Sequence, residues 1–224
     1  MGTVGTALGR ILPPYVETEE VFGEPDEAAL LPGEEQAVAG AVVVRRREYA
    51  AARCCARACL GRLGYGPVAL PRGVGGAPVW PLGVRGSLTH CAGYVAAAVA
   101  RADRITALGI DAEPDAPLPD GVLDLVSTQA ERERLPAGSD APDGPSWDRL
   151  LFSAKEAVYK TWFPVVGGWL DHHEVEVSFT GGDAFTAVLA REGLVVDGGP
   201  VSCLHGRWTR ARGILLTAVV LAPG

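Results

Sequence analysis

The sequence has little lysine and no long apolar run, and these shortages exclude whole classes of protein. Lys155 and Lys160 are the only lysines, against eighteen arginines, in 224 residues. No run of 18 apolar residues is present, so we expect no membrane-spanning helix. The start, MGTVGTALGR, lacks the basic and apolar regions of a secretory signal. The sequence has no long basic tail of the kind that would indicate a nucleic-acid partner. We therefore expect a cytoplasmic protein with neither a membrane nor a nucleic-acid partner.

Cysteine is present, but not in a pattern that serves a disulfide or metal framework. The five cysteines are an odd number, and no two are spaced as CxxC. We therefore expect the cysteines to be reduced and to act as small apolar side chains, as is typical of cytosolic proteins. These residues are Cys54, Cys55, Cys59, Cys91 and Cys203.

Apolar residues are abundant, at 48% of the chain, and charged residues make up 21%. These proportions predict a folded protein with a substantial core. The formal net charge of −7 is unevenly distributed, because residues 1–36 hold eight acidic residues against Arg10. Residues 37–224 hold nineteen charges of each sign. The negative excess therefore belongs to the N-terminal segment.

Apolar periodicity predicts the elements of the first half of the chain. The run at 37–44 predicts a buried strand, and apolar side chains at three- and four-residue intervals predict a helix over 45–63. Glycine and proline predict a loop over 66–86. Two β-prone runs, at 94–100 and 105–113, predict a hairpin, although the alanine-rich first run also permits a helix.

The second half repeats the order of strand, helix and antiparallel strands. We therefore expect an α+β fold of two similar, pseudo-twofold halves, each with a long helix packed on a mainly antiparallel sheet. The divisions are an acidic segment at 1–36, a first half at 37–104 and a second half at 105–224. The expected elements are a break at 114–121, helices over 122–135 and 147–163 joined by a flexible connection at 136–146, and two C-terminal hairpins, EVEVSF with AFTAVLA and GRWT with ILLTAVVL. Pro164 is expected to end the second helix.

Two carboxylates in the segment GIDAEP are candidate metal ligands. Asp111 and Glu113 are two apart, so on a strand they project from the same face. Two adjacent carboxylates repel each other unless a cation lies between them, and oxygen ligands suit Mg²⁺ or Mn²⁺. The alternative is a solvated strand end before a loop.

The segment FSAKEAVYK adds a third carboxylate. Helical spacing places Phe152, Glu156 and Lys160 on one stripe. Glu156 and Lys160 are either a surface ion pair worth a few tenths of a kcal/mol, or a metal ligand and a counter-charge for a phosphate.

Two further segments could bind an anion. In GSLTHCAGY, Thr89 and His90 can both donate hydrogen bonds, although a lone histidine is more often structural. The stretch 45–62 carries six arginines against Glu48, and Arg46, Arg53 and Arg57 share one helix face. This stretch is either a compact anion site or a solvated helix surface.

The order of these four segments resembles one family. R-x₂-E-Y-x₃-R from Arg45 precedes GSLTHCAGY, then GIDAE, then FSAKEAVYK. The arrangement resembles the 4′-phosphopantetheinyl transferases, in particular the larger, monomeric type that serves siderophore, polyketide and nonribosomal-peptide synthases. It is most similar to the actinobacterial members, including the mycobacterial one. The resemblance extends from residue 38 to the final strand, through WDRLLF, TWFPVVGGWL and GRW.

The resemblance implies roles for individual residues. Asp111, Glu113 and Glu156 match the acidic trio around Mg²⁺ and the pyrophosphate of coenzyme A. Lys160 matches the lysine that steadies the phosphates, and Lys155 matches the adjacent family lysine. The remaining matches are Arg45 and Arg53 for the 3′-phosphate, Thr89 and His90 for the phosphates, and Trp169 and Leu170 for the pantetheine side.

The implied reaction moves 4′-phosphopantetheine from coenzyme A to a serine of apo acyl or peptidyl carrier domains, and releases adenosine 3′,5′-bisphosphate. Coenzyme A carries several negative charges, which explains the need for both a metal ion and guanidinium groups. Glu156 is the preferred base for the serine proton, with a metal-bound water as the rival. Carrier domains are commonly acidic, so this acidic chain must meet them through local basic or apolar patches.

One departure from the family pattern lies in the loop GVGGAPVWP. Relatives carry a lysine where this chain has Gly75. We expect Arg72, three residues upstream, to reach the same phosphate in its place.

Three other functions are compatible with parts of this pattern. A Mg²⁺-dependent phosphohydrolase acting on nucleotides would use the same carboxylates with water as the nucleophile. A noncatalytic coenzyme-binding module would not need the complete carboxylate trio. The smaller trimeric transferase of fatty-acid synthesis is disfavoured, because its shorter chains lack the first-half motifs.

Overall fold

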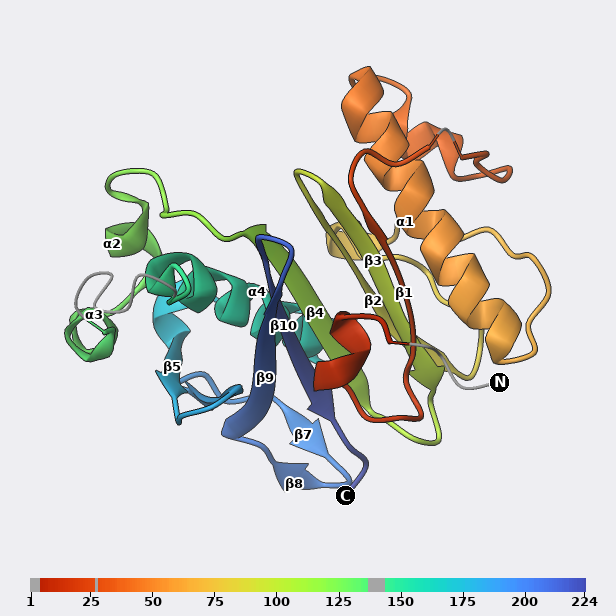
Figure 1. The fold of residues 1–224 in the computed structure, drawn as a ribbon. Helices are drawn as coiled ribbons and strands as arrows, with labels where there is room; N and C mark the ends of the chain where they lie inside the picture. Colours follow the sequence, from red (N-terminus) through yellow and green to blue (C-terminus); the bar gives the residue numbers. More distant parts are fainter. Residues whose placement is uncertain (1–4, 27, 137–143) are drawn as a thin grey trace.

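The computed structural model describes residues 5–26, 28–136 and 144–224. Within these ranges the chain forms two large antiparallel sheets, each accompanied by one long helix, and a separate two-stranded sheet (Figure 1). The expected α+β class is therefore confirmed. The similarity of the two halves stays a prediction.

The first sheet has three strands and is covered by helix α1, Val43–Arg62. Its order is β1-β3-β2, with β1 at Glu17–Phe22, β2 at Val84–Cys91 and β3 at Tyr94–Arg101. Small side chains of α1, including Ala56 and Cys59, pack against β3 with no exposed surface. This close packing holds α1 over one face of the sheet.

The second sheet has five strands in the order β4-β10-β9-β6-β5, and α4, Trp147–Val166, packs on it. Trp162 of α4 is fully buried and anchors the helix in this core. The strands are β4, Ala107–Pro114; β5, Val175–Phe179; β6, Ala184–Leu189; β9, Cys203–Ala211; and β10, Ile214–Leu221.

Short elements complete the two halves. They are η1, Leu8–Ile11; η2, Glu35–Val38; η3, Val74–Gly76; α2, Val122–Val126; α3, Gln129–Arg134; η4, His172–Glu174; and the pair β7, Val195–Val196, and β8, Gly199–Pro200. None of the helices in the described ranges combines the length and the hydrophobicity needed to cross a membrane.

Two expectations for the first half were wrong. Residues 37–44 form no strand, because η2 and a turn precede α1 and leave Val42, Val43 and Val44 exposed. The runs at 94–100 and 105–113 are both strands, but they do not pair with each other. β3 pairs with β1 and β2, whereas β4 pairs with β10 in the other sheet. The observed hairpin uses residues 84–91, part of which was expected to be loop.

Helix boundaries also differ from the expectations. The segment at 122–135 forms two short helices, α2 and α3, because Ser127 and Thr128 interrupt it and Thr128 caps α3. Pro164 does not end α4, which continues to Val166. The expected connection at 136–146 lies mostly outside the described residues. The two C-terminal hairpins are confirmed as β5 with β6 and β9 with β10.

Candidate active site

A glycine brings helix α4 and the edge strand β4 of the second sheet together at the site. A Cβ atom on Gly109 of β4 would lie 2.0 Å from the Ala157 carbonyl oxygen and 2.5 Å from Thr161 Oγ1. Only glycine therefore allows α4 to approach β4 this closely. The approach places Lys160 of α4 beside Asp111 of β4.

Asp111 is the best-buried carboxylate of the predicted acidic trio. Its Oδ1 accepts a 2.6 Å hydrogen bond from Lys160 Nζ and a 3.3 Å bond from Thr89 Oγ1. Thr89 comes from β2 of the first sheet, so this contact joins the two halves. Within the described ranges, Asp111 Oδ2 is buried without a hydrogen-bond partner. An unpaired carboxylate oxygen of this kind needs a donor or a cation.

The other two carboxylates lie close enough for Asp111 to affect their protonation. Burial raises the pKa of Glu113, and the charge of Asp111 raises it further. Burial raises the pKa of Glu156 in the same way, again with Asp111 as the next cause. Glu113 accepts a 2.9 Å hydrogen bond from Arg149 Nη1. The charge of Asp111 therefore acts on both of the other carboxylates.

The trio does not form a closed metal cluster. Among the described residues, no three His, Cys, Asp or Glu side chains gather closely enough to hold a metal ion. The protein's own cations instead neutralise two members, since Lys160 pairs with Asp111 and Arg149 with Glu113. The donor set still fits a hard divalent cation, because it consists of carboxylates and includes the unpartnered Asp111 Oδ2.

Cationic groups of the first half face this carboxylate group. Arg53 is buried, with its guanidinium 3.5 Å from the centre of the Tyr49 ring and its Nε donating to the Leu70 carbonyl oxygen. Arg45 is exposed and lies 3.6 Å from Glu48. Stacking and burial fix the direction of the Arg53 guanidinium, whereas Arg45 can adjust to a ligand.

His90 is a neutral hydrogen-bonding group at physiological pH. Burial, followed by the charges of Arg45, Lys160 and Arg53, lowers its pKa to about 4. Glu48 lies 3.5 Å from His90 Nε2 but does not offset these causes. His90 can therefore donate one hydrogen bond to an anion without carrying a charge.

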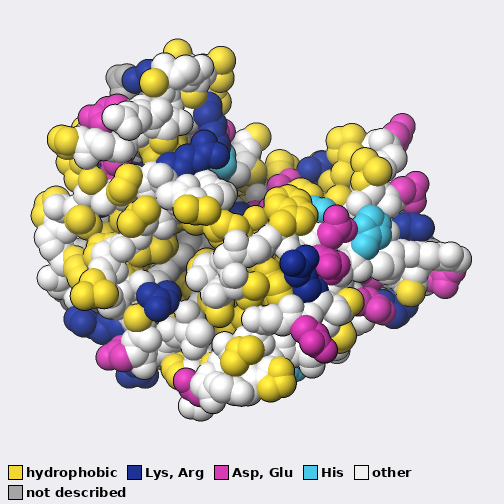
Figure 2. Space-filling view, turned by 180° about the vertical axis from the view of Figure 1, so that it is seen from behind, with side chains coloured by type: hydrophobic (Ala, Val, Ile, Leu, Met, Phe, Trp, Pro, Cys, Tyr) yellow, Lys and Arg dark blue, Asp and Glu magenta, His cyan; other side chains and the backbone are white. Residues whose placement is uncertain are grey.

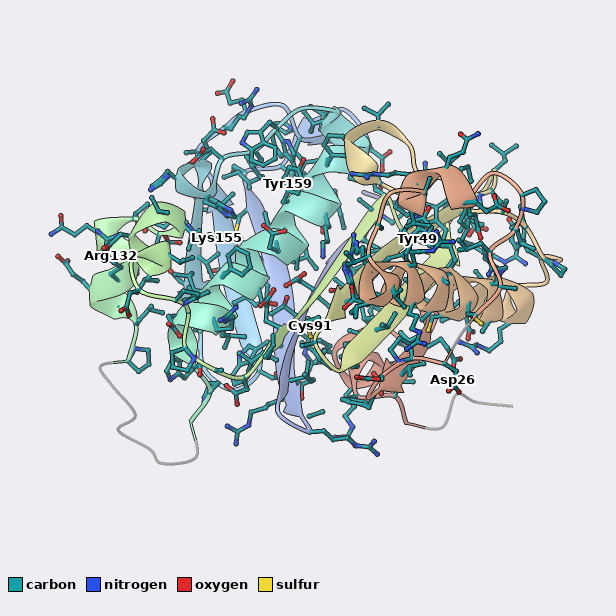
Figure 3. The ribbon with its side chains drawn as sticks, turned by 90° about the horizontal axis from the view of Figure 1, so that it is seen from above. Asp26, Tyr49, Cys91, Arg132, Lys155 and Tyr159 are labelled. Carbon is teal, nitrogen blue, oxygen red and sulfur yellow. The ribbon has the colours of Figure 1, made fainter. Side chains whose placement is uncertain are left out.

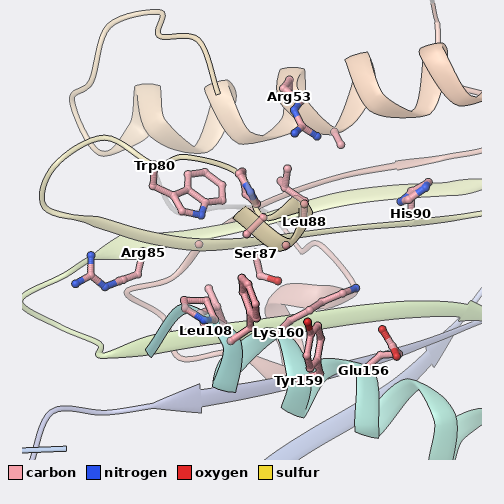
Figure 4. A pocket seen from close by; sticks show the side chains of 18 of the residues that line it. Arg53, Trp80, Arg85, Ser87, Leu88, His90, Leu108, Glu156, Tyr159 and Lys160 are labelled. Carbon is pink, nitrogen blue, oxygen red and sulfur yellow. The ribbon is translucent and has the colours of Figure 1, made fainter. Parts of the chain in front are cut away.

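These groups surround a cavity of about 280 Å³ between α1 and α4 (Figure 4). Arg45, Arg53 and His90 line it from the first half, and Glu156 and Lys160 line it from the second. Figure 4 shows Arg53 above and Lys160, Tyr159 and Glu156 below this space. The cavity therefore brings together five of the ten residues expected to bind coenzyme A. Its other lining residues include Tyr49, Trp80, Arg85 and Phe163.

A second cavity of about 210 Å³ lies on the other side of Tyr159 and Glu156, which line both. Its wall includes Trp169 and Leu170, the residues expected on the pantetheine side. Leu170 is buried, whereas the Trp169 ring is mostly exposed and packs 5.1 Å from the Tyr159 ring. Both cavities are lined by apolar as well as charged side chains.

Lys155 does not line the larger cavity. Its Nζ donates 2.7 Å hydrogen bonds to Glu131 Oε2 and to the His172 carbonyl oxygen, and both ends of the ion pair are buried. Figure 3 places Lys155 on the side of α4 toward α3, the helix that carries Arg132. Binding of coenzyme A by Lys155 stays a prediction; in the structure its ammonium group is in a buried ion pair with Glu131, and its side chain lines the smaller cavity.

The arginine-rich helix is not one anion site. Arg57 donates two hydrogen bonds to the buried carboxylate of Glu34, at 2.8 and 3.0 Å. Arg62 pairs with Glu17 and Glu19 at 2.7 Å. Acidic residues of the N-terminal segment therefore neutralise Arg57 and Arg62 of α1. These ion pairs between the segment and the helix were not predicted from the sequence.

The loop that carries Gly75 has no room for a larger residue. Gly75 adopts a φ of +62°, and a Cβ atom there would lie 2.2 Å from Phe163 Cζ. Arg72 is not among the residues that line either cavity, and its guanidinium lies against Gly76. The expectation that Arg72 substitutes for a lysine at Gly75 is thus not supported by its position.

Several residues of the site were not anticipated. Tyr49 carries Arg53 on its ring, Arg149 pairs with Glu113, and Trp80 lines the larger cavity. Tyr49 precedes Arg53 by four residues, a helical spacing that could have indicated the stacking. For Arg149 and Trp80 the chain offers no local signal, because their contacts join distant segments.

Comparison with known proteins identifies the class to which this fold and site belong. Residues 33–100 match the family model of the 4′-phosphopantetheinyl transferase N-terminal domain, and residues 107–201 match that of the 4′-phosphopantetheinyl transferase superfamily. The chain belongs to the 4′-phosphopantetheinyl transferases, enzymes that modify carrier proteins with a group taken from coenzyme A.

Three curated relatives cover nearly the whole chain. The 4′-phosphopantetheinyl transferase Svp of Streptomyces mobaraensis is 47% identical over 219 residues, covering 96% of this chain and 89% of the relative. Npt of Nocardia iowensis is 46% identical, covering 96% of this chain and 100% of the relative. PptT of Mycobacterium tuberculosis is 42% identical, covering 98% and 100%. The expected similarity to actinobacterial members, including the mycobacterial one, is confirmed.

Proposed function

We propose that this enzyme transfers 4′-phosphopantetheine from coenzyme A to a serine hydroxyl of apo acyl or peptidyl carrier domains of polyketide and nonribosomal-peptide synthases, releasing adenosine 3′,5′-bisphosphate. The observation that carries the proposal is the cavity between α1 and α4, where Arg45, Arg53 and Lys160 face Glu156. Cations suited to several phosphates and a carboxylate suited to a hydroxyl proton share one space. All these groups come from one chain, so the proposed site needs no residue from a second copy, which is compatible with the expected monomer.

The cations of the cavity bind different phosphates of coenzyme A. Arg45 and Arg53 hold the 3′-phosphate, with Arg53 already oriented by the Tyr49 ring. The neutral His90 donates a hydrogen bond to the remaining phosphates and Lys160 adds a positive charge, whereas the Thr89 hydroxyl donates to Asp111. Fixing the substrate in this way lowers the entropic part of the barrier. Trp169 and Leu170 contact the pantetheine arm in the second cavity.

Asp111, Glu113 and Glu156 would hold a divalent cation, Mg²⁺ or Mn²⁺. Such an ion, when bound, supplies charge neutralisation for the departing bisphosphate. The protein's part is to orient the carboxylates. Lys160 and Thr89 do so for Asp111, and Arg149 does so for Glu113.

Glu156 accepts the proton of the carrier serine. Burial and the neighbouring Asp111 raise its pKa, which makes Glu156 a stronger base than an exposed glutamate. The serine oxygen then attacks the β-phosphorus of coenzyme A, and the phosphoanhydride bond to the bisphosphate breaks. Lys160 stays beside the phosphates and stabilises the negative charge on the leaving group.

Mass spectrometry of carrier domains tests this function directly. The chain is incubated with coenzyme A, Mg²⁺ and a panel of purified apo carrier domains. The expected result is the gain of one phosphopantetheine group on one serine. Phosphate release without a carrier would indicate a phosphohydrolase instead, and coenzyme binding without any product would indicate a noncatalytic module.

A further inference from the structure

The start of α1 combines two features that a surface helix normally avoids. Val42, Val43 and Val44 are 73%, 64% and 65% exposed. Arg45, Arg46 and Arg47 follow directly and are exposed as well. Residues 42–47, named here the 42–47 patch, therefore present a continuous apolar and basic surface.

This composition is unfavourable for the helix itself. The N-terminal end of a helix carries a partial positive charge, so cations there are repelled. The first turn of α1 contains no acidic residue, and Val42 at the N-cap makes no side-chain hydrogen bond. Arg46 and Arg47 have no carboxylate within ion-pair distance in the part of the chain that the structure describes. Within the described residues, the pair of Arg45 with Glu48 is the only ion pair of these three arginines.

The patch adjoins the mouth of the larger cavity. Arg45 belongs both to the patch and to the lining of the cavity. Arg46 and Arg47 belong to the patch but do not line the cavity. In the space-filling view, basic side chains gather on one side of a notch, and acidic and histidine side chains lie across it (Figure 2). A carrier protein that brings its serine to Glu156 must cover the rim of this cavity. The 42–47 patch is part of that rim on the α1 side.

We propose that the 42–47 patch binds the carrier protein, through a face on which carboxylates and apolar side chains lie together. This inference rests on the proposed function and adds to it the place and chemistry of docking. The arginines pair with the carrier carboxylates, and the valines lose their exposure to water. A local patch of this kind explains how a chain with a net charge of −7 associates with an acidic partner.

Two other occupants fit less well. Coenzyme A meets its cations inside the cavity, and three exposed valines offer nothing to a phosphate. In a twofold contact with a second copy, the patch would bring arginines of both copies together, which costs energy.

Charge reversal provides a test that separates docking from folding. The double variant Arg46→Glu with Arg47→Glu should raise the KM for an acidic apo acyl carrier domain about tenfold. The KM for coenzyme A should stay unchanged. The melting temperature should stay the same or rise, because glutamate near a helix N-terminus is favourable. The salt dependence of kcat/KM for the carrier should become weaker.

A second variant tests the apolar part. Val42→Ser introduces a preferred N-cap residue and should raise the melting temperature, while it raises the KM for the carrier. The matched control is Arg10→Glu with Arg104→Glu, which makes the same change in net charge near η1 and the end of β3, and should leave the carrier KM unchanged.

The outcomes distinguish the possible errors. An unchanged carrier KM in both variants, or an equal rise in the control, would overturn the docking site while leaving the transferase activity standing. A rise in the KM for coenzyme A alone would assign the patch to the coenzyme. Dimers of the wild type, seen by sedimentation and lost in the variants, would assign the patch to self-association. Absence of transfer by the wild type would overturn the proposed function, and the docking inference with it.

Discussion

Asp111 is the side chain on which the candidate site depends most. Its Oδ1 accepts hydrogen bonds from Lys160 of α4 and Thr89 of the first sheet, and its Oδ2 is buried with no hydrogen-bond partner among the described residues. Its charge also contributes to the raised pKa of both Glu113 and Glu156. Asp111 therefore connects the two halves and contributes, after burial, to the raised pKa of both neighbouring carboxylates.

Replacement of Asp111 by alanine should abolish transfer while preserving the fold. We expect kcat/KM to fall at least about 100-fold, because an oriented charge at the reacting phosphates is lost. Transfer to a carrier domain in the presence of Mg²⁺ measures the effect, and circular dichroism checks folding. The exposed Asp103→Ala serves as the control. Normal activity of Asp111→Ala would contradict the metal assignment.

Arg53 provides a prediction about substrate discrimination. Arg53→Ala removes the guanidinium held on the Tyr49 ring, so it should weaken the binding of coenzyme A about tenfold or more. Binding of 3′-dephospho-coenzyme A should change much less. Calorimetric titration of both ligands gives the comparison. Equal losses for the two ligands would show that Arg53 does not contact the 3′-phosphate.

His90 predicts a dependence of stability on pH. Its pKa in the folded protein is about 4, below the ordinary value of 6.5. Between these two values the unfolded chain binds a proton that the folded protein does not, so acidification lowers the free energy of unfolding. Denaturant titrations from pH 7 to pH 4 should therefore show a smaller loss for His90→Gln than for the wild type. Parallel curves for the two proteins would argue against the lowered pKa.

Helix α4 carries two lysines with different tasks, five residues apart. Lys160 projects toward β4 and the cavity, whereas Lys155 is buried against Glu131 of α3. Glu131 also accepts a hydrogen bond from the Val177 backbone N–H of β5. The buried pair therefore ties α3, α4 and β5 together behind the site.

Substitution of these lysines should separate stability from rate. Lys155→Met leaves Glu131 charged and buried, which should cost about 3–5 kcal/mol of folding free energy. Lys160→Ala should reduce the rate of transfer with only a small change in melting temperature, because Lys160 is partly exposed. Denaturant unfolding and carrier assays on both variants provide the comparison. A large rate loss in folded Lys155→Met, with full stability, would instead indicate that Lys155 contacts coenzyme A.

The N-terminal segment links the two sheets of the molecule. η1 packs on β9 and β10 of the second sheet, and β1 pairs with β3 of the first. Glu20 of β1 accepts hydrogen bonds from the Ala7 and Leu8 backbone N–H groups and from Tyr94 Oη. The acidic segment thus contributes to the core between the halves.

Leu8→Ala tests this link. Leu8 is fully buried in the cluster that joins η1, β3, β4 and β10, so truncation should cost about 2–5 kcal/mol. If the halves fold as one unit, unfolding should remain a single transition at a lower denaturant concentration. The exposed Leu82→Ala is the control. An unchanged midpoint for Leu8→Ala would show that the segment does not hold the halves together.

Local patterns in the chain were sufficient for several parts of the fold. The two long helices follow from apolar spacing at three and four residues, and the C-terminal hairpins follow from short β-prone runs around glycine-containing turns. The failed strand at 37–44 shows the limit of this reasoning. Its valines satisfy the pattern of a buried strand. In the described structure this segment pairs with neither sheet, and Val42–Val44 are exposed instead.

The sequence by itself determined the α+β class, the family and the residue types of the site, because motif order and spacing are properties of the chain. Only the tertiary structure decided the partners of these residues. It separated β3 from β4, buried Lys155 against Glu131, and neutralised Arg57 with Glu34. The physical reason is that ion pairing and strand pairing join segments far apart in the chain, and each charge takes the partner that burial and packing leave within reach.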